Sequence, residues 1–290
     1  MIAGTRARNA FVMALLMAAV SPWAARSLPA QSVCTPSAGS SEGRLLAFSA
    51  IPLAFASALP GPALNRGEIV VGLELSAIPE PAASIQRSDE CFVEKGQNTQ
   101  LSRVLPRPRV AVGLPGGVMV EVSYLPPVTV ADATPSLLGI ALGYTTRVTP
   151  AVTAMVRAHG TIGYVDGPVT CARSALQGDP TQPCFGTEPS NDRYAPNAYG
   201  LEFLLGTQLS ARVSASLGAG ATHLRPRFRV GFRNGFGLLD ETRVEQNFTR
   251  ATLMANLAAS LTPRLGLGAQ AYAVPRDGAT IRLTTQWKVR

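Results

Sequence analysis

Apolar and polar residues alternate with a period of two through most of the chain. In "EIVVGLELS" (68–76), one face carries four aliphatic residues and the opposite face carries Glu68 and Glu74. Successive side chains of a β-strand point to opposite sides of the sheet, so this period predicts strands and not helices. The last segment, "ATIRLTTQWKVR" (279–290), repeats the pattern and ends the chain on a strand.

The alternation predicts ten strands, most of them close to the ~9–11 residues with which a tilted strand crosses a membrane. They are 68–76, 109–114, 117–125, 137–148, 151–164, 199–209, 212–222, 248–261, 264–274 and 279–290. Short turns (114–117, 149–150, 209–211, 262–263) alternate with longer polar segments (79–107, 126–135, 165–198, 223–247), and only 275–278 is short on the long-loop side. An even strand number with short turns at one rim and long loops at the other is typical of a membrane β-barrel.

The polar faces of these strands suit the interior of a narrow barrel. They are dominated by Gly, Ser, Thr and Gln with isolated charges, whereas the solvent face of a soluble sandwich would be rich in Lys and Glu. A lone buried charge costs several kcal/mol, so we expect arginines and glutamates to pair across the lumen. The predicted lumen-lining residues are Glu74, Arg109, Glu121, Arg147, Arg157, His159, Glu202, Arg212, Arg250 and Arg282.

The apolar faces then meet hydrocarbon, and the aromatic residues near strand ends support this. Such residues form girdles at the membrane interface; here they are Tyr124, Tyr144, Tyr164, Tyr199 and Trp287. We therefore predict an all-β fold, an antiparallel transmembrane β-barrel of about ten strands over residues 67–290. A twelve-stranded barrel and a secreted β-sandwich that serves as a binding module are the alternatives.

The strand–turn–strand segments "VTPAVTA" (148–154) and "LTPRLGLGAQ" (261–270), with the alternating C-terminal strand, resemble those of bacterial outer-membrane β-barrel proteins. The resemblance implies location in the outer membrane of a Gram-negative-type bacterium, contact with outer-membrane lipid, and insertion by the outer-membrane assembly machinery. One feature departs from that class, which usually ends on an aromatic residue: here Trp287 is followed by "KVR".

The first 32 residues have the order of a cleaved secretory signal peptide. Arg6 and Arg8 precede an apolar stretch from Phe11 to Val20, and small residues follow it. The apolar stretch is shorter than the ~20 residues of a membrane-spanning helix. Export in turn makes disulfides plausible. Cys171 and Cys184 bracket a short polar loop, and Cys34 and Cys91 remain as a second candidate pair.

The segment "RLLAFSAIPLAFASALPG" (44–61) is apolar on all sides and does not alternate. With Pro52 in its middle it is too short and too broken to cross a membrane as a helix. A kinked helix of this length reaches nearly the height of a barrel. We therefore assign residues 33–66 either to a plug inside the lumen or to a cap on the periplasmic side.

The segment "THLRPRFRVGFRNGFGLLDET" (222–242) interrupts the strand pattern. Asn234-Gly235 predicts a type I′ hairpin turn, and a change in the parity of the apolar positions predicts a bulge or turn near Pro226. Arg225, Arg227 and Arg229 share one face. We interpret this face as the solvated side of a hairpin above the membrane, in preference to a site for lipid phosphate groups.

The sequence offers little that indicates chemistry. The formal net charge is +8, but no run of basic residues interleaved with aromatics predicts a nucleic-acid groove. His159 and Thr161 have the spacing of the His and Ser of outer-membrane acyl hydrolases, yet the register turns both toward the lumen, and we expect no enzyme. Two histidines without clustered Cys or Asp predict no metal site, and no cofactor is expected.

Two functions fit such a barrel. The first is porin-like passive transport of small or hydrophobic solutes, which is similar to the role of the fatty-acid uptake channels if 44–61 is a plug. The second is a structural or surface-interaction barrel whose lumen is closed by ion pairs. The apolar N-terminal segment favours transport. The oligomeric state is left open.

Overall fold

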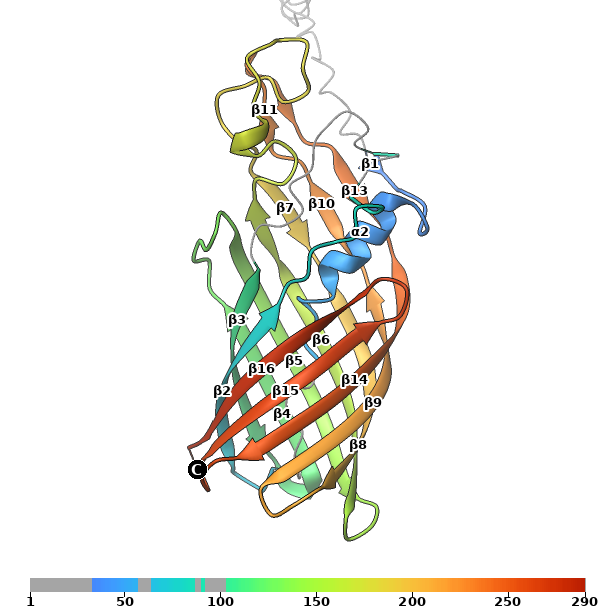
Figure 1. Ribbon diagram of the computed structural model, residues 1–290, viewed down its shortest axis with the longest axis vertical. Coiled ribbons are helices and arrows are strands. Elements are labelled where there is room, and N and C mark those ends of the chain that lie inside the picture. Colours follow the sequence, from blue (N-terminus) through green and yellow to red (C-terminus); the bar gives the residue numbers. More distant parts are fainter. Residues whose placement is uncertain (1–32, 57–63, 87–89, 92–102, 290) are drawn as a thin grey trace, which may run out of the picture. The chain divides into compact units, whose positions relative to one another are not determined.

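Ten antiparallel strands close into a barrel in the computed structural model, which describes residues 33–56, 64–86, 90–91 and 103–289 (Figure 1). The barrel strands are β2 (Ile69–Ala77), β3 (Val104–Gly113), β4 (Val118–Leu125), β5 (Thr134–Arg147), β6 (Val152–Gly167), β8 (Ala198–Gln208), β9 (Val213–Leu224), β14 (Phe248–Ser260), β15 (Leu265–Val274) and β16 (Gly278–Lys288). Pairing of β16 with β2 closes the ring. The ten-stranded prediction is confirmed, and the twelve-stranded alternative is wrong. The predicted signal peptide lies outside the described residues.

The strand faces are sorted as their period predicts. On β2, Val71, Leu73 and Leu75 are exposed on the outer surface, while Glu74 and Ser76 are fully buried inside. Tyr124, Tyr144, Tyr199 and Trp287 are each about half exposed near the strand ends. A charged interior with an apolar exterior is the reverse of a soluble sandwich, so the chain is a β-barrel of the outer-membrane type.

Among the described residues, no helix is long and apolar enough to cross a membrane.

Short turns join the strands at the rim where β2 begins and β16 ends. The turn between β3 and β4 contains a short 3-10 helix, Pro115–Gly117, in which Gly116 and Gly117 have φ values of 76° and 80°. Only glycine adopts this left-handed region without strain, which is why the pair stands there.

A smaller sheet continues the barrel wall above the long-loop rim. Its strands are β7 (Asp192–Ala195), β10 (Arg227–Arg229), β13 (Arg243–Glu245) and β1 (Val33–Cys34), attached in this order to the end of β6. A short 3-10 helix, Arg173–Ala175, lies in the preceding loop. The sequence interpretation had assigned 165–198 and 223–247 to loops and a hairpin. Instead β9 ends before Pro226 and β10 departs to join this sheet.

The hairpin around Asn234 exists but its predicted turn type is wrong. It joins β11 (Phe232–Arg233) to β12 (Leu239–Asp240) through a five-residue loop. The Asn234 side chain accepts hydrogen bonds from the backbone N–H groups of Phe236 and Leu238. The positive φ falls at Gly237 instead of Gly235, because the asparagine caps the loop with its own side chain.

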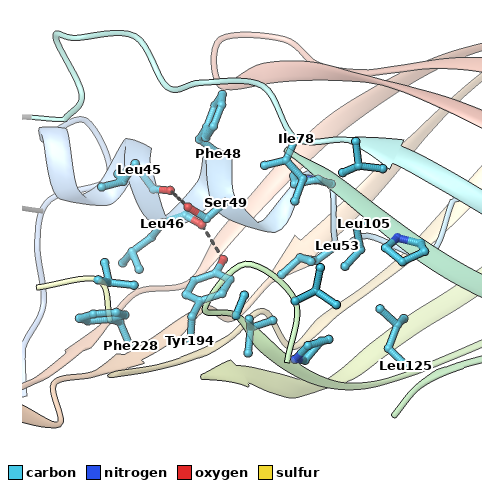
Figure 2. A pocket seen from close by; sticks show the side chains of 18 of the residues that line it. Leu45, Leu46, Phe48, Ser49, Leu53, Ile78, Leu105, Leu125, Tyr194 and Phe228 are labelled. Atoms are coloured by element: carbon cyan, nitrogen blue, oxygen red, sulfur yellow. Dashed lines mark hydrogen bonds between the residues drawn. The ribbon is translucent and has the colours of Figure 1, made fainter. Parts of the chain in front are cut away.

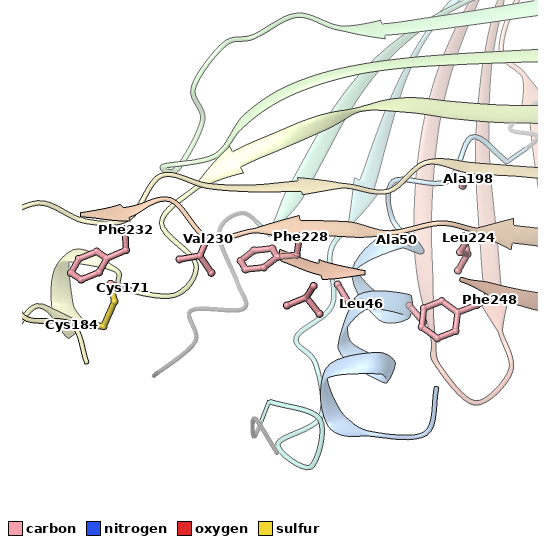
Figure 3. Close-up of a cluster of buried hydrophobic side chains, with 12 residues drawn as sticks. Leu46, Ala50, Cys171, Cys184, Ala198, Leu224, Phe228, Val230, Phe232 and Phe248 are labelled. Carbon is pink, nitrogen blue, oxygen red and sulfur yellow. A yellow bond between two sulfur atoms is a disulfide. The ribbon is translucent and has the colours of Figure 1, made fainter. Parts of the chain in front are cut away.

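Two disulfides join Cys34 to Cys91 and Cys171 to Cys184, the pairings that the sequence favours. The second lies in an apolar core that runs from the loops down to the barrel mouth (Figure 3). In that core Phe228, Val230 and Phe232 point to one side of their segment. Phe228 lies near Leu46 of the N-terminal helix, whereas Phe232 lies beside the Cys171–Cys184 disulfide. The loops are therefore anchored by a core of their own.

The N-terminal segment passes from the long-loop end toward the short-turn end. Helix α2 (Ser41–Ala50) begins at Ser40, whose side chain accepts a hydrogen bond from the N–H of Gly43 and caps the helix. Residues 51–56 contact the arginines of the lumen. Gly67 then donates to the carbonyl of Gly113 at the opposite rim.

Candidate functional site

A chain of buried ion pairs crosses the lumen. Arg109 pairs with Glu74 and, at 2.7 Å, with Glu121. Glu121 also lies 2.9 Å from Arg157, which in turn lies 3.0 Å from Glu202. All five side chains are at most 6% exposed. Alternation of charge is what makes their burial tolerable, because each ion is desolvated but has a partner of opposite sign.

The other predicted lumen residues lie in three places. Arg282 and His159 are buried in the lumen, where the His159 ring lies 3.5 Å from Glu202. Arg250 lies at the long-loop rim, 2.6 Å from Asp277. Arg147 and Arg212 are exposed at the short-turn rim. The alternation assigns both to the inner face, but they stand at the ends of their strands, beyond the enclosed lumen.

Arg107 belongs to the lumen, and the sequence interpretation missed it. The predicted strand began at Arg109, but β3 begins five residues earlier, at Val104. The residues before Arg109 were assigned to the long polar segment 79–107, although Pro106 and Pro108 both lie within β3. The signal was nevertheless present in "VLPRPRV" (104–110), where the arginines keep the period of two.

Four lumen arginines hold the segment 51–56, which we call the lumen segment, by its backbone. The hydrogen bonds are 2.7–3.1 Å long and run from Arg107 to the carbonyls of Leu53 and Ala54, from Arg109 to Ala56, from Arg157 to Phe55 and from Arg282 to Ile51. A buried segment outside a helix leaves carbonyls without partners, and buried carbonyls need donors. The arginines provide those donors while they neutralise the glutamates.

Phe55 fills the space among these guanidinium groups. Its ring centroid lies 4.4 Å from Arg109, 5.1 Å from Arg157 and 5.8 Å from Arg107, distances at which a cation interacts with a ring face. A Cβ atom on Gly139 would lie only 2.8 Å from the ring. Glycine on the inner face of β5 therefore makes the room that Phe55 occupies.

An apolar cavity of about 460 Å³ lies above the lumen segment, between α2 and the upper strands (Figure 2). Leu46, Leu53, Leu105 and Leu125 contribute to its walls. Tyr194 donates to the carbonyl of Leu46 at 2.8 Å and so ties helix α2 to β7. Burial raises the pKa of Tyr194, so its hydroxyl stays protonated and keeps donating.

The same cavity reaches the outer surface of the wall. Pro106, Pro108 and Val128 line it, although the two prolines and Val128 are exposed on the outside of the barrel. In the register, β3 pairs with β4 only from Arg109 to Gly113, whereas it pairs with β2 from Val104 onward. Proline has no N–H to donate to a neighbouring strand. The wall is thus unpaired between β3 and β4 where the cavity meets it.

Comparisons with known proteins agree on architecture only. No protein-family model and no characterised protein sequence matches the chain. Among solved structures, the attachment invasion locus protein Ail of Yersinia pestis is similar at a TM-score of 0.32 and 10% identity, over 77% of this chain and 98% of Ail. The toluene transporter TodX of Pseudomonas putida has a TM-score of 0.33 and 12% identity, over 89% of this chain and 78% of TodX. The toluene transporter TbuX of Ralstonia pickettii has a TM-score of 0.32 and 10% identity, over 79% of this chain and 73% of TbuX. Likeness this low carries no functional argument for this chain.

Proposed function

We propose that this protein is a passive channel for small apolar solutes in the outer membrane of a Gram-negative-type bacterium. The single observation that carries the proposal is the apolar cavity of about 460 Å³, which is large enough for a small ligand. Burying a polar molecule there would leave its hydrogen-bonding groups without partners, so the lining favours apolar solutes.

The cavity has a route to the membrane. Above the Arg109–Ser123 register pair, β3 and β4 share no further pair among the described residues. Exposed apolar residues, Val104, Val128 and Val130, flank this gap. A solute that leaves the cavity sideways passes from one apolar environment to another, whereas the straight path down the lumen meets buried charges.

The lumen segment serves as the plug of this channel. Its carbonyls bind four arginines, and Phe55 is completely buried among them. Water and ions are thereby kept from the axial path. In this proposal the N-terminal part of the chain, 33–66, is a plug and not a periplasmic cap.

A structural or surface-interaction barrel is the second candidate. The ion pairs that run from Glu74 to Glu202 favour this structural role, because they fill the lumen and leave no axial path for a solute. In either case the outer-membrane assembly machinery and outer-membrane lipid are the expected partners.

Entry of a fluorescent apolar probe, N-phenyl-1-naphthylamine, into intact cells tests the channel. Cells that produce the protein are expected to take up the probe faster than cells without it, with no change in entry of glucose. Leu53→Glu puts a charge into the cavity and is expected to return uptake to the level of cells without the protein. Leu238→Glu, the same change in an exposed loop residue, is the control. Equal uptake with and without the protein would favour the structural barrel.

A further inference from the structure

Charged side chains form a row across the outer face of the small sheet above the barrel. The register places Asp166 of β6 opposite Arg193 of β7, and Arg193 opposite Arg229 of β10. Arg229 is in turn opposite Arg243 of β13. Neighbouring strands lie ~4.8 Å apart, so the three arginine positions span about 10 Å.

The opposite face of the same three strands is already occupied. Tyr194, Phe228 and Val244 line the apolar cavity on the inner side. Because side chains alternate between the faces of a strand, the arginines of the row point away from the cavity and from α2. The row is therefore separate from the proposed channel.

Carboxylates neutralise only part of this surface. Asp166 accepts two hydrogen bonds from Arg193, at 2.7 and 2.9 Å. Two register positions closer to the barrel, Glu245 pairs with Arg227 at 3.1 Å. The next carboxylate along the chain, Glu241, precedes β13 and has an interaction of its own.

Among the residues that the structure describes, Arg229 and Arg243 have no such carboxylate partner. Within the part of the chain that the structure describes, neither guanidinium has an ion pair or a side-chain hydrogen bond, and both residues are partly exposed. Like charges directly opposite each other on adjacent strands destabilise a sheet. An anion bound between them would remove that repulsion.

The row lies just beyond the apolar band of the barrel. Along β6 the outward residues are Ile162, which is 58% exposed, then Tyr164 and then Asp166. The Arg193 guanidinium lies 3.7 Å from the centroid of the Tyr164 ring. At ~3.3 Å per residue the row lies about 7 Å along the strand from this tyrosine. Aromatic girdle residues lie at the level of the lipid headgroups, so the row stands beside the headgroup region.

We propose that Arg229 and Arg243 bind a phosphate group of an outer-leaflet lipid, although the sequence pattern alone favours a solvated face for Arg229. The long-loop rim of such barrels faces the outside of the cell, where the leaflet lipid is a phosphorylated glycolipid. Two guanidinium groups supply planar pairs of N–H donors that match the oxygens of one phosphate. The lipid's acyl chains would then lie along the apolar surface below, beside Ile162.

Native mass spectrometry of the full protein, released from an uncharged detergent, tests this site. The probes are bisphosphorylated lipid A, the same lipid after removal of its phosphates, and inorganic phosphate. The wild-type protein is expected to retain the phosphorylated lipid and to lose the phosphate-free lipid. In the double variant Arg229→Gln/Arg243→Gln, the apparent affinity for the phosphorylated lipid is expected to fall by at least about tenfold.

The double variant Arg147→Gln/Arg212→Gln is the matched control, because it removes the same charge from the opposite rim. It is expected to bind lipid as the wild type does. Heat-modifiable migration on a gel verifies that each variant is a folded barrel. Unchanged lipid retention in Arg229→Gln/Arg243→Gln would overturn the proposal, and so would equal retention of the phosphate-free lipid. Displacement by equimolar inorganic phosphate would show a site for free anions instead of lipid.

Discussion

The guanidinium of Arg157 donates to the backbone carbonyl of Phe55 at 2.7 Å, although 102 positions separate the two residues. The same guanidinium contacts Glu121 and Glu202. One side chain therefore links the N-terminal segment, β4 and β8 at the centre of the barrel. The arginine that binds the backbone of the lumen segment also neutralises the glutamates. The position of the segment and the burial of these charges therefore depend on each other.

Phe55→Ala is expected to create an ion path through the lumen. The ring occupies the space among three guanidinium groups, and water will fill the volume that it leaves. Because the nearest charges are arginines, the path is expected to favour chloride over potassium. Planar-bilayer recordings under a KCl gradient measure this preference.

Phe236→Ala, in an exposed loop, controls for loss of an aromatic ring and is expected to leave conductance at the wild-type level. A cation-selective path in Phe55→Ala would contradict the role assigned to the arginines.

Glu121→Gln is expected to destabilise the barrel by about 3 kcal/mol, the order found when one member of a buried charge network is removed. Its carboxylate bridges Arg109 and Arg157, and an amide cannot neutralise them. Urea titration of the folded band on unheated gels measures the loss. Glu188→Gln, an exposed carboxylate, is expected to shift the midpoint little; equal shifts in both variants would rule out a special role for Glu121.

The two disulfides are expected to differ in what they restrain. Cys34–Cys91 closes a loop of 57 positions that contains the lumen segment, and chain entropy gives such a closure about 4 kcal/mol. Its removal by Cys34→Ser/Cys91→Ser is expected to lower stability and raise ionic conductance. Cys171→Ser/Cys184→Ser is expected to increase only proteolysis of its own loop. Unchanged conductance in the first variant would show that the lumen segment is held without the disulfide.

Asp192→Ala is expected to loosen the loops above the barrel without unfolding it. The buried carboxylate accepts hydrogen bonds from the backbone N–H groups of Val169, Thr170 and Gly231. Each buried N–H left without an acceptor costs roughly 1–3 kcal/mol. Hydrogen exchange of these three amides is expected to accelerate, while the barrel amides keep their protection.

Asp179→Ala is the control for that variant, because Asp179 accepts from Thr181 in an exposed turn. Protection of Val169, Thr170 and Gly231 that survives in Asp192→Ala would show that the loop core holds them by packing alone.

Protonation of Glu68 at the short-turn rim is expected to account for part of the stability that the protein loses in acid. Burial would raise the pKa of this carboxyl, but hydrogen bonds from Lys288 and Asn65 and the charge of Lys288 lower the pKa below its usual 4.5. A group with a lowered folded-state pKa stabilises the protein above its unfolded pKa, and this contribution is lost as the pH falls through the folded value. Glu68→Gln is therefore expected to be less stable than the wild type at pH 7 in urea titrations. The difference is expected to narrow below pH 4.5 and to vanish once the pH is below the folded-state pKa. A difference that persists at low pH would assign the effect to packing.

Local sequence determined the number of barrel strands, their faces and the short turns between them. Alternation in segments such as 68–76 is a property of neighbouring residues. A strand with one apolar and one polar side can place each side in a suitable environment in only one orientation, because a shift by one residue would exchange the two faces. The same period assigns Glu74, Glu121, Arg157 and Glu202 to the inner face, where their side chains are buried. The start of β3 was missed; there Pro106 and Pro108, which have no N–H to donate, stand where β3 pairs with β2 but not with β4.

Only the tertiary structure decided which groups these buried side chains contact. The contacts of Arg157 with Phe55 and of Arg282 with Ile51 join parts of the chain that are 102 and 231 positions apart. They depend on the stagger of the closed sheet and on the path of the N-terminal segment inside it. The row from Arg193 to Arg243 likewise follows from strand pairing beyond the rim. Periodicity assigns a side chain to a face, whereas its partner across the barrel is set by long-range register, which no local pattern contains.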